Sequence, residues 1–408
     1  MGVHPPDPRQ RLLVVGGGPA QLGLLAAARA RGIETVVCDR DSSALGLRLA
    51  DRHAVVSTED EGGIEQVARD EEVGGLIAPG IDWPVAICAR IAARLDLPHP
   101  LPPEVAERTV SKIVQRERFD EARVPQPRWG LVGGSEPLSN SLLQSLGLQP
   151  PLIVKPPDRQ GQVGLAVVSS EEELGPAVAF GVEASRHGEV LVEELVDGPE
   201  VTVNAFSIGG DFRALTVTDR ITAEPPAFGV ALAHVWPSEA AVEEAVDVAR
   251  AAADALGVRE GPTYTQIRFG PDGPRVMELA ARLGGGHDAE LCEAALGIDL
   301  NALALGAALG RSVSIPPARP AGGACVRFLV APPGRLEAVE GLTEALEIPG
   351  VLDAVPYRPP GWEFGPLRTG HDRAGFVLAR GDSRAEAVER AADAAERIRF
   401  VVDGADGN

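Results

Sequence analysis

A strand–helix–strand pattern in residues 11–39 sets the fold of the N-terminal part of the chain. One short apolar run leads into Gly16-Gly17-Gly18, a helical segment ends at Gly32, and a second apolar run ends at Asp39. Glycines permit the tight turn between the first strand and the helix, and two buried strands joined by a helix form a parallel pair. The pattern therefore predicts an open parallel sheet of Rossmann type.

The same alternation continues along the chain. Strands are expected at residues 54–57 and 76–78, and helices at residues 63–71 and 84–95. A dinucleotide-binding fingerprint would need a third glycine where Gln21 stands, which disfavours a nicotinamide-dependent dehydrogenase. The N-terminal domain is thus predicted to be Rossmann-like without binding a dinucleotide.

The loop 79–83 follows one of these strands, at the edge where open α/β sheets bind ligands. Asp82 in this loop either faces a substrate amine or caps the following helix, the more common role of an isolated aspartate there. Trp83 beside it is likewise expected to be structural rather than catalytic.

Charge and length restrict the class of protein. The 408 residues predict two to four domains, and 59 acidic against 38 basic side chains give a formal net charge of −21. Such a field disfavours nucleic acid and anionic membranes as partners, so an anionic substrate can bind only in a locally positive pocket. No apolar run reaches about 18 residues, which predicts no membrane span. The first residues lack the pattern of a signal peptide.

Cysteine usage is consistent with a cytoplasmic protein. The cysteines are far apart and have no CxxC pair, so neither structural zinc nor disulfides are expected. They are Cys38, Cys88, Cys292 and Cys325.

Only two of the basic residues are lysines, Lys112 and Lys155. A compact ammonium that can be desolvated suits a phosphate oxygen better than the planar guanidinium of arginine does. Lys155 ends a predicted strand, and residues 156–164 form a Gly/Gln-rich loop that returns as a second strand. Backbone N–H groups of such a loop can close on phosphates. The loop is not a P-loop, because no GxxxxGK[ST] sequence opens a helix.

A second group of polar residues lies further along the chain. The strand end at residues 192–196 can pair its backbone with an adenine edge, and Glu200 beyond the turn can reach ribose hydroxyls. Gln266 and Glu278 lie on adjacent predicted strands, and two oxygen ligands near phosphates indicate Mg²⁺. Arg282 follows at the entrance to a glycine-rich loop.

In this order, these motifs resemble the ATP-grasp superfamily of carboxylate–amine ligases over residues 11–310. The tail resembles the C-terminal domain of the L-amino-acid ligase branch, whose members make dipeptides. The motifs are Ser111-Lys112, Ile153-Val154-Lys155-Pro156, the flap, Val192–Glu200, Glu278-x-x-x-Arg282-x-Gly-Gly-Gly-His287, Ile348–Val351, Gly365–Val377 and Gly381-Asp382-Ser383.

The resemblance implies an α/β and α+β multidomain fold. A Rossmann-like pre-ATP-grasp domain is expected at residues 1–108. The two-part ATP-grasp fold is expected at 109–310, with a lid at about 124–192. A small α+β domain is expected at 320–408, and a homodimer is compatible with the resemblance.

Site residues carried over from the family fall into four roles. The phosphates and adenosine of ATP are assigned to Lys112, Lys155, Gly161, Gln162, Glu193, Glu194, Val196 and Glu200. Mg²⁺, or Mn²⁺ in its place, is assigned to Gln266 and Glu278. Arg282 and Lys155 are the catalytic residues, with Arg282 at the acyl phosphate and tetrahedral intermediate. His287, Gly285 and Asp82 are assigned to the substrate pocket.

Two positions depart from the family pattern. The first metal position is usually glutamate but is Gln266, which can coordinate through its carbonyl at the loss of one negative charge. Two residues after Glu278, where many relatives carry a metal-binding asparagine, stands Ala280. The number of metal ions therefore stays open.

The implied reaction joins a carboxylate to an amine through an acyl phosphate and releases ADP and phosphate, with amino acids as expected substrates. One alternative is a carboxylase or purine-pathway ligase that activates bicarbonate or formate. Another is a protein that binds ATP without catalysis, which Gln266 and Ala280 suggest. Arg368, His371 and Asp372 in the tail are expected in a surface turn.

Overall fold

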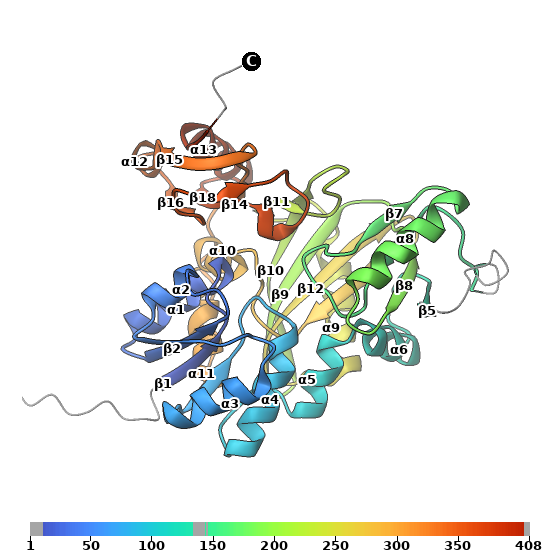
Figure 1. The fold of residues 1–408 in the computed structure, drawn as a ribbon, viewed down its shortest axis with the longest axis horizontal. Helices are drawn as coiled ribbons and strands as arrows, with labels where there is room; N and C mark the ends of the chain where they lie inside the picture. The colour runs from blue at the N-terminus through green and yellow to red at the C-terminus, as the bar shows by residue number, and fades with distance from the viewer. Residues whose placement is uncertain (1–10, 134–142, 144–145, 404–408) are drawn as a thin grey trace, which may run out of the picture.

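The computed structural model describes residues 11–133, 143 and 146–403. The first ten residues, where the sequence predicts no signal peptide, lie outside this range, as do parts of the predicted lid and tail. Figure 1 shows the N-terminal domain beside a long central sheet, a smaller sheet across from it, and the C-terminal module above the N-terminal domain. Among the described residues, no helix has the length and apolar character needed to span a bilayer.

The N-terminal domain contains the predicted parallel sheet, with strand order β3-β2-β1-β4. The central strand β1 is an unbroken apolar run whose residues 12–15 are fully buried, as expected for a parallel sheet covered on both faces. The elements are β1 (Arg11–Val15), α1 (Leu22–Ala30), β2 (Glu34–Asp39), α2 (Leu45–Leu49), β3 (Arg52–Val55), α3 (Glu61–Asp70), β4 (Gly75–Ile77) and α4 (Trp83–Leu95).

Two helices and a small antiparallel sheet follow. The sheet has the order β5-β8-β6-β7, and its connection from β6 to β7 is the Gly/Gln-rich flap, residues 156–165. The elements are α5 (Pro103–Val110), α6 (Lys112–Ala122), β5 (Trp129–Gly133), β6 (Leu152–Lys155), β7 (Ala166–Val168), α8 (Glu171–Ala184) and β8 (Glu189–Glu194).

An eight-stranded sheet, in the order β13-β12-β9-β10-β11-β14-β18-β16, forms the centre of the molecule. Strand β11 pairs with β14, so strands of the C-terminal module continue the central sheet without a break. The elements up to residue 308 are β9 (Glu200–Ile208), β10 (Asp211–Thr222), β11 (Ala231–Trp236), α9 (Val242–Leu256), β12 (Gly261–Gly270), β13 (Gly273–Ala280), α10 (Asp288–Leu296) and α11 (Leu300–Ala308).

The C-terminal module also has a three-stranded sheet of its own, in the order β17-β15-β19. Its alanine-rich helix α13 packs on β14 and β18 and buries Ala387, Ala391 and Ala394. The elements are β14 (Gly323–Leu329), β15 (Gly334–Glu340), α12 (Leu342–Leu346), β16 (Val351–Pro356), β17 (Glu363–Phe364), β18 (Gly375–Gly381), α13 (Arg384–Arg397) and β19 (Arg399–Val402).

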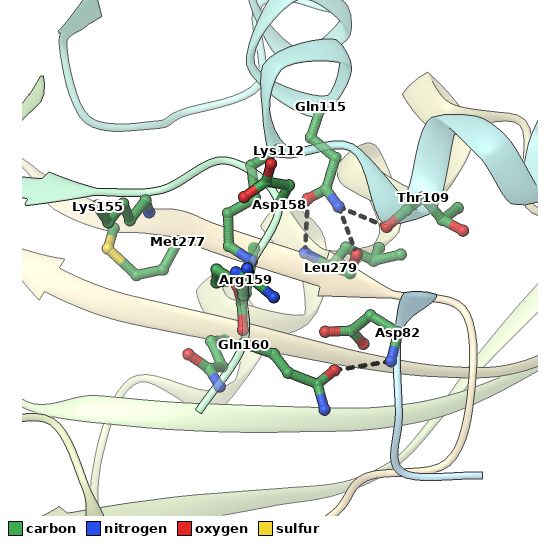
Figure 2. Close-up of polar contacts among 12 residues, drawn as sticks. Asp82, Thr109, Lys112, Gln115, Lys155, Asp158, Arg159, Gln160, Met277 and Leu279 are labelled. Atoms are coloured by element: carbon green, nitrogen blue, oxygen red, sulfur yellow. Dashed lines mark hydrogen bonds and ion pairs between the residues drawn. The ribbon is translucent and has the colours of Figure 1, made fainter. Parts of the chain in front are cut away.

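A buried amide ties α6 to the central sheet, as Figure 2 shows. The side-chain nitrogen of Gln115 donates to the carbonyls of Thr109 (2.7 Å) and Leu279 (2.9 Å), and its oxygen accepts from the Leu279 N–H (3.0 Å). Three backbone groups that have lost water are thereby satisfied by one side chain. Gln115 thus sets the position of α6, which begins at Lys112, relative to β13.

We expect Gln115→Leu to lower the free energy of unfolding by about 2–4 kcal/mol, because buried polar groups lose their partners. Urea denaturation measures the change. The matched control is Gln66→Leu, since Gln66 is exposed and bonds only to Asp70; its effect should stay within about 0.5 kcal/mol. Equal stability of the two variants would contradict the structural role of Gln115.

Candidate active site

Two connected cavities lie between the sheets. A cavity of ≈ 120 Å³ separates the small sheet from β12 and β13 of the central sheet. It opens into one of ≈ 670 Å³, whose walls also include the N-terminal loops and the C-terminal module. Lys112, Gln266 and Glu278 line both cavities, so they stand at the junction.

The two lysines reach the smaller cavity from different elements. Ser111 caps α6 by accepting from the Val114 N–H, which leaves Lys112 as the first helical residue. Its ammonium donates to the Arg159 carbonyl (2.8 Å) and lies 3.2 Å from a Glu278 oxygen. Lys155 ends β6, as the sequence predicts.

Lys155 and Arg116 share one buried carboxylate. Glu193 is 2 % exposed and bonds to the Lys155 ammonium and to Arg116 Nε, both at 2.8 Å. Burial alone would raise the pKa of Glu193, but Arg116 and then Lys155 offset it and hold the pKa at about 2. The Glu193 side chain is therefore already satisfied by two cations, and its backbone lies in the ladder between β5 and β6.

The pKa values of the two lysine ammonium groups shift in opposite directions, although both groups are desolvated. Burial lowers the pKa of Lys155, because Glu193 compensates only in part and Arg116 adds repulsion. At Lys112 burial acts in the same direction, but Glu278 and Asp82 overcome it and raise the pKa. Both side chains are only 13–14 % exposed.

The smaller cavity has an apolar end and a charged end. Arg220 and Arg268 both hold Glu200, Arg268 Nε at 2.9 Å. Arg268 also donates to the Val196 carbonyl (3.2 Å). Glu194 lines the cavity but bonds to Arg128 and Arg275, while the apolar wall comes from Ile153, Leu195, Val196, Phe228 and Met277.

Gln266 and Glu278 face each other directly across the β12–β13 ladder. Burial would raise the pKa of Glu278, but Lys112 and Lys155 hold it at about 2, so this carboxylate is ionised. The Gln266 amide donates to the Tyr264 hydroxyl (3.3 Å), which leaves its oxygen as the group able to coordinate. Ala280 supplies no ligand, and no cluster of three or more His, Cys, Asp or Glu that could hold a metal occurs in the described part of the chain.

Arg282 is fixed by Asp82 from the N-terminal domain. Its Nε and a terminal nitrogen lie 2.8 Å and 2.6 Å from the same Asp82 oxygen. Asp82 makes no side-chain cap on α4, so its carboxylate serves Arg282 rather than the helix. The Asp82 N–H in turn donates to the flap residue Gln160 (2.8 Å), as Figure 2 shows.

The flap contacts the C-terminal module as well. Gly161 and Gln162 line both cavities and both have φ of +68°, a backbone conformation that favours glycine. A Cβ at Gly161 would lie 3.2 Å from the His371 ring. Flap, N-terminal loop and C-terminal module therefore meet around one space.

Gly285 lines the larger cavity, whereas His287 lies behind its wall. His287 is 4 % exposed, stacks on Phe376 at 3.6 Å and lies 2.6 Å from the Tyr357 hydroxyl, which does line the cavity. Burial, and then the charge of Arg373, lower the pKa of His287 to about 3. Any influence of His287 on a substrate must therefore pass through Tyr357.

Several lining residues are missing from the sequence-based set. Arg220 lies on β10 and pairs across the sheet with Glu200, but single-sequence patterns do not give this pairing. Asp372 caps a turn with Thr369, as expected for a hydrogen-bonded turn, while its neighbour His371 lines the larger cavity. Tyr357 and Arg373 join it from the same module.

Family models match two parts of the chain. Residues 148–290 match an ATP-grasp domain, and residues 327–403 match the L-amino acid ligase C-terminal domain 2. An uncharacterized protein, y4rH of Sinorhizobium fredii, is 30% identical over 76% of this chain, and the match spans 65% of the length of that relative. The formate-dependent phosphoribosylglycinamide formyltransferase of Thioalkalivibrio sulfidiphilus is 26% identical over 96% of this chain and 97% of its own length.

Solved structures share the fold. The L-amino acid ligase from Bacillus licheniformis has a TM-score of 0.80 at 21% identity, over 97% of this chain and 99% of that one. Phosphoribosylglycinamide synthetase from Anaerococcus prevotii has a TM-score of 0.77 at 19% identity, over 96% and 99%. The mixed α/β multidomain fold is therefore that of ATP-grasp ligases. The two family models show that the chain contains an ATP-grasp domain at residues 148–290 and an L-amino acid ligase type C-terminal domain at residues 327–403.

Proposed function

We propose that the protein is an ATP-dependent ligase that joins the carboxylate of one amino acid to the amine of another. The reaction would pass through an acyl phosphate and release ADP and phosphate. One observation carries the proposal: both lysines of the chain line the smaller cavity, and Lys112 also lines the larger cavity, whose wall includes Arg282. The C-terminal domain match supports amino acids over bicarbonate or formate.

The smaller cavity fits a nucleotide in its chemistry. Its apolar end can hold a flat base, and Glu200, held by two arginines, offers a carboxylate oxygen toward a ribose. Lys112 and Lys155 are paired with carboxylates that phosphate oxygens can replace as partners. Backbone groups of the flap close the phosphate end.

Gln266 and Glu278 would hold Mg²⁺, or Mn²⁺, with phosphate oxygens and water as the remaining ligands. When bound, the metal would neutralise charge on the transferred phosphoryl group. One carboxylate and one amide give a weaker protein contribution than two carboxylates. This donor set supports a site that depends strongly on nucleotide for its affinity.

The residues of the chain would divide the reaction as follows. Lys112 and Lys155 neutralise the phosphates as the substrate carboxylate attacks. Arg282, kept in place by Asp82, faces the oxygen that becomes negative when the amine attacks. Gln160 holds the flap on the Asp82 backbone and thereby keeps water from the acyl phosphate.

Amino acids should stimulate ADP release only when both an acid and an amine substrate are present. Lys155→Met should lower that rate about 100-fold or more, because one charge-stabilising group is lost. The measurement is ADP formation with Mg-ATP against amino acids singly and in pairs, with bicarbonate and formate in separate wells, and the amide product is weighed by mass spectrometry. Arg118→Met, on the exposed side of α6, is the control.

If ADP is released with bicarbonate or formate alone, the acid substrate is one of these and not an amino acid. If no well releases ADP although the protein binds nucleotide, the non-catalytic alternative is favoured.

The scarcity of lysine permits a direct map of the nucleotide site. Acetylation at pH 8 should modify Lys155 faster than Lys112, because a lowered pKa leaves more of Lys155 as neutral amine and a raised pKa leaves less of Lys112. Mg-ATP should slow both reactions about tenfold or more, by occupying the ammonium groups. Peptide mass spectrometry measures each rate, with the N-terminal amine as internal reference. Unchanged lysine rates with Mg-ATP would remove both from the nucleotide site.

Gln266→Glu should lower the Mg²⁺ concentration for half-maximal ADP release several-fold, about 3- to 10-fold, because it restores one negative charge to the metal site. Gln266→Ala should raise it. Titration of Mg²⁺ at fixed ATP tests both variants, and Gln66→Glu on exposed α3 controls for net charge. Identical titrations for all three variants would place the metal elsewhere.

A further inference from the structure

The larger cavity is lined by more arginines than its acidic residues neutralise. Arg186 pairs with Glu59, and the pairs of Arg220 and Arg282 are described above. The lining arginines are Arg40, Arg159, Arg186, Arg220, Arg282, Arg358 and Arg373. In the described residues, four of them, Arg40, Arg159, Arg358 and Arg373, have no carboxylate within 4.0 Å.

Three of these unpaired arginines gather at one end of the cavity. Arg40, Arg358 and Arg373 all act electrostatically on His371, and we call the three the basic cluster. Partial desolvation, and then the charges of Arg373 and the other two arginines, lower the pKa of His371. Arg159 belongs instead to the flap, where its Nε donates to the Ala184 carbonyl (2.5 Å).

The guanidinium of Arg373 is held in place without being neutralised. It lies 3.8 Å from the centre of the Phe328 ring, and its Nε donates to the Gly370 carbonyl (2.8 Å). Burial, and the repulsion of Arg220, lower the pKa of Arg373. A half-buried cation without a counter-ion has lost part of its hydration, which is costly, so the arrangement favours an anionic ligand.

Arg358 is fixed in a similar way. Its guanidinium lies 4.0 Å from the centre of the Trp362 ring and donates to the His371 carbonyl (3.4 Å). Arg40 follows β2 directly and is exposed. The nearby acids are engaged elsewhere: Asp41 bonds to Ser43, and Asp372 caps its own turn. Within a chain of net charge −21, this end of the cavity is a local concentration of positive charge.

We propose that the basic cluster binds an anionic group of the amine substrate, a carboxylate or a phosphate. The inference rests on the proposed ligase function. When two amino acids are joined, the carboxylate of the acid substrate is consumed, and only that of the amine substrate stays free. Planar guanidinium groups suit both anions because they bind them through two parallel hydrogen bonds. A bound anion at the basic cluster would aim the amine toward the junction at Lys112 and Glu278.

The test uses the full chain saturated with Mg-ADP, so that the nucleotide site is filled. Glycine, glycinamide and aminomethylphosphonate are titrated by calorimetry. Glycine should bind at least tenfold more tightly than glycinamide, which lacks the anion. Tighter binding of aminomethylphosphonate than of glycine would identify a phosphate-bearing amine as the natural class of substrate.

Arg373→Met and Arg358→Met should each lower the affinity for glycine at least tenfold and leave the affinity for glycinamide unchanged. Arg373→Lys should have an intermediate effect. Arg327→Met is the matched control, because Arg327 lies on β14 of the same module, is exposed and does not line the cavity. If Arg373→Met fails to fold, the half-buried Arg358 and exposed Arg40 carry the test.

Equal affinity for glycine and glycinamide would overturn the proposal. Unchanged glycine affinity in the Arg358 and Arg373 variants would also overturn it, as would the absence of saturable binding for every probe. The ADP assay separates this from failure of the ligase function. If Arg373→Met retains ligase activity with an unchanged Michaelis constant for the amine, the anion site is contradicted and the ligase function is still supported. Anion binding without ADP release in any well would support the anion site and contradict the ligase function.

Discussion

The buried carboxylate of Glu193 is the interaction on which the site depends. It brings Arg116 of α6 and Lys155 of β6 to one point, and Arg116 also donates to the Val276 and Met277 carbonyls of β13. Four separate elements, β8, α6, β6 and β13, are therefore held together by one charge network. Removal of one member would leave an uncompensated buried charge, which is costly. The network thus explains why Lys155, at the end of β6, lies in the cavity between the small sheet and the central sheet.

Continuity of the central sheet places the C-terminal module in the site. Pairing of β11 with β14 extends the strands that carry Gln266 and Glu278 into strands of the last 90 residues. The same pairing carries Tyr357 and Arg373 to the wall of the larger cavity. The C-terminal module therefore forms part of the wall of the candidate site.

The sequence predicted the residues that are marked by local patterns. The parallel sheet follows from apolar runs and glycine turns, and Lys155 follows from its place at the end of a strand. Strand β11 was not expected, because its six residues include one polar side chain, His234, and therefore show no alternation of apolar and polar residues. Arg220, Arg116 and Tyr357 were missed for a related reason. Their roles arise from partners 20, 77 and 70 residues away, Glu200, Glu193 and His287, which no local pattern contains.

The unbroken sheet also sets a scale for substrates. Hydrogen-bonded central strands open only at nearly the full cost of unfolding. The distance between Gln266 and Glu278, on β12 and β13, and the lining residues at 357–358 and 370–373, beside β16 and β18, is therefore fixed by the sheet. In the proposed ligase reaction, a bulky acid substrate would leave less room for its amine partner, so the two would be selected by their combined length rather than separately.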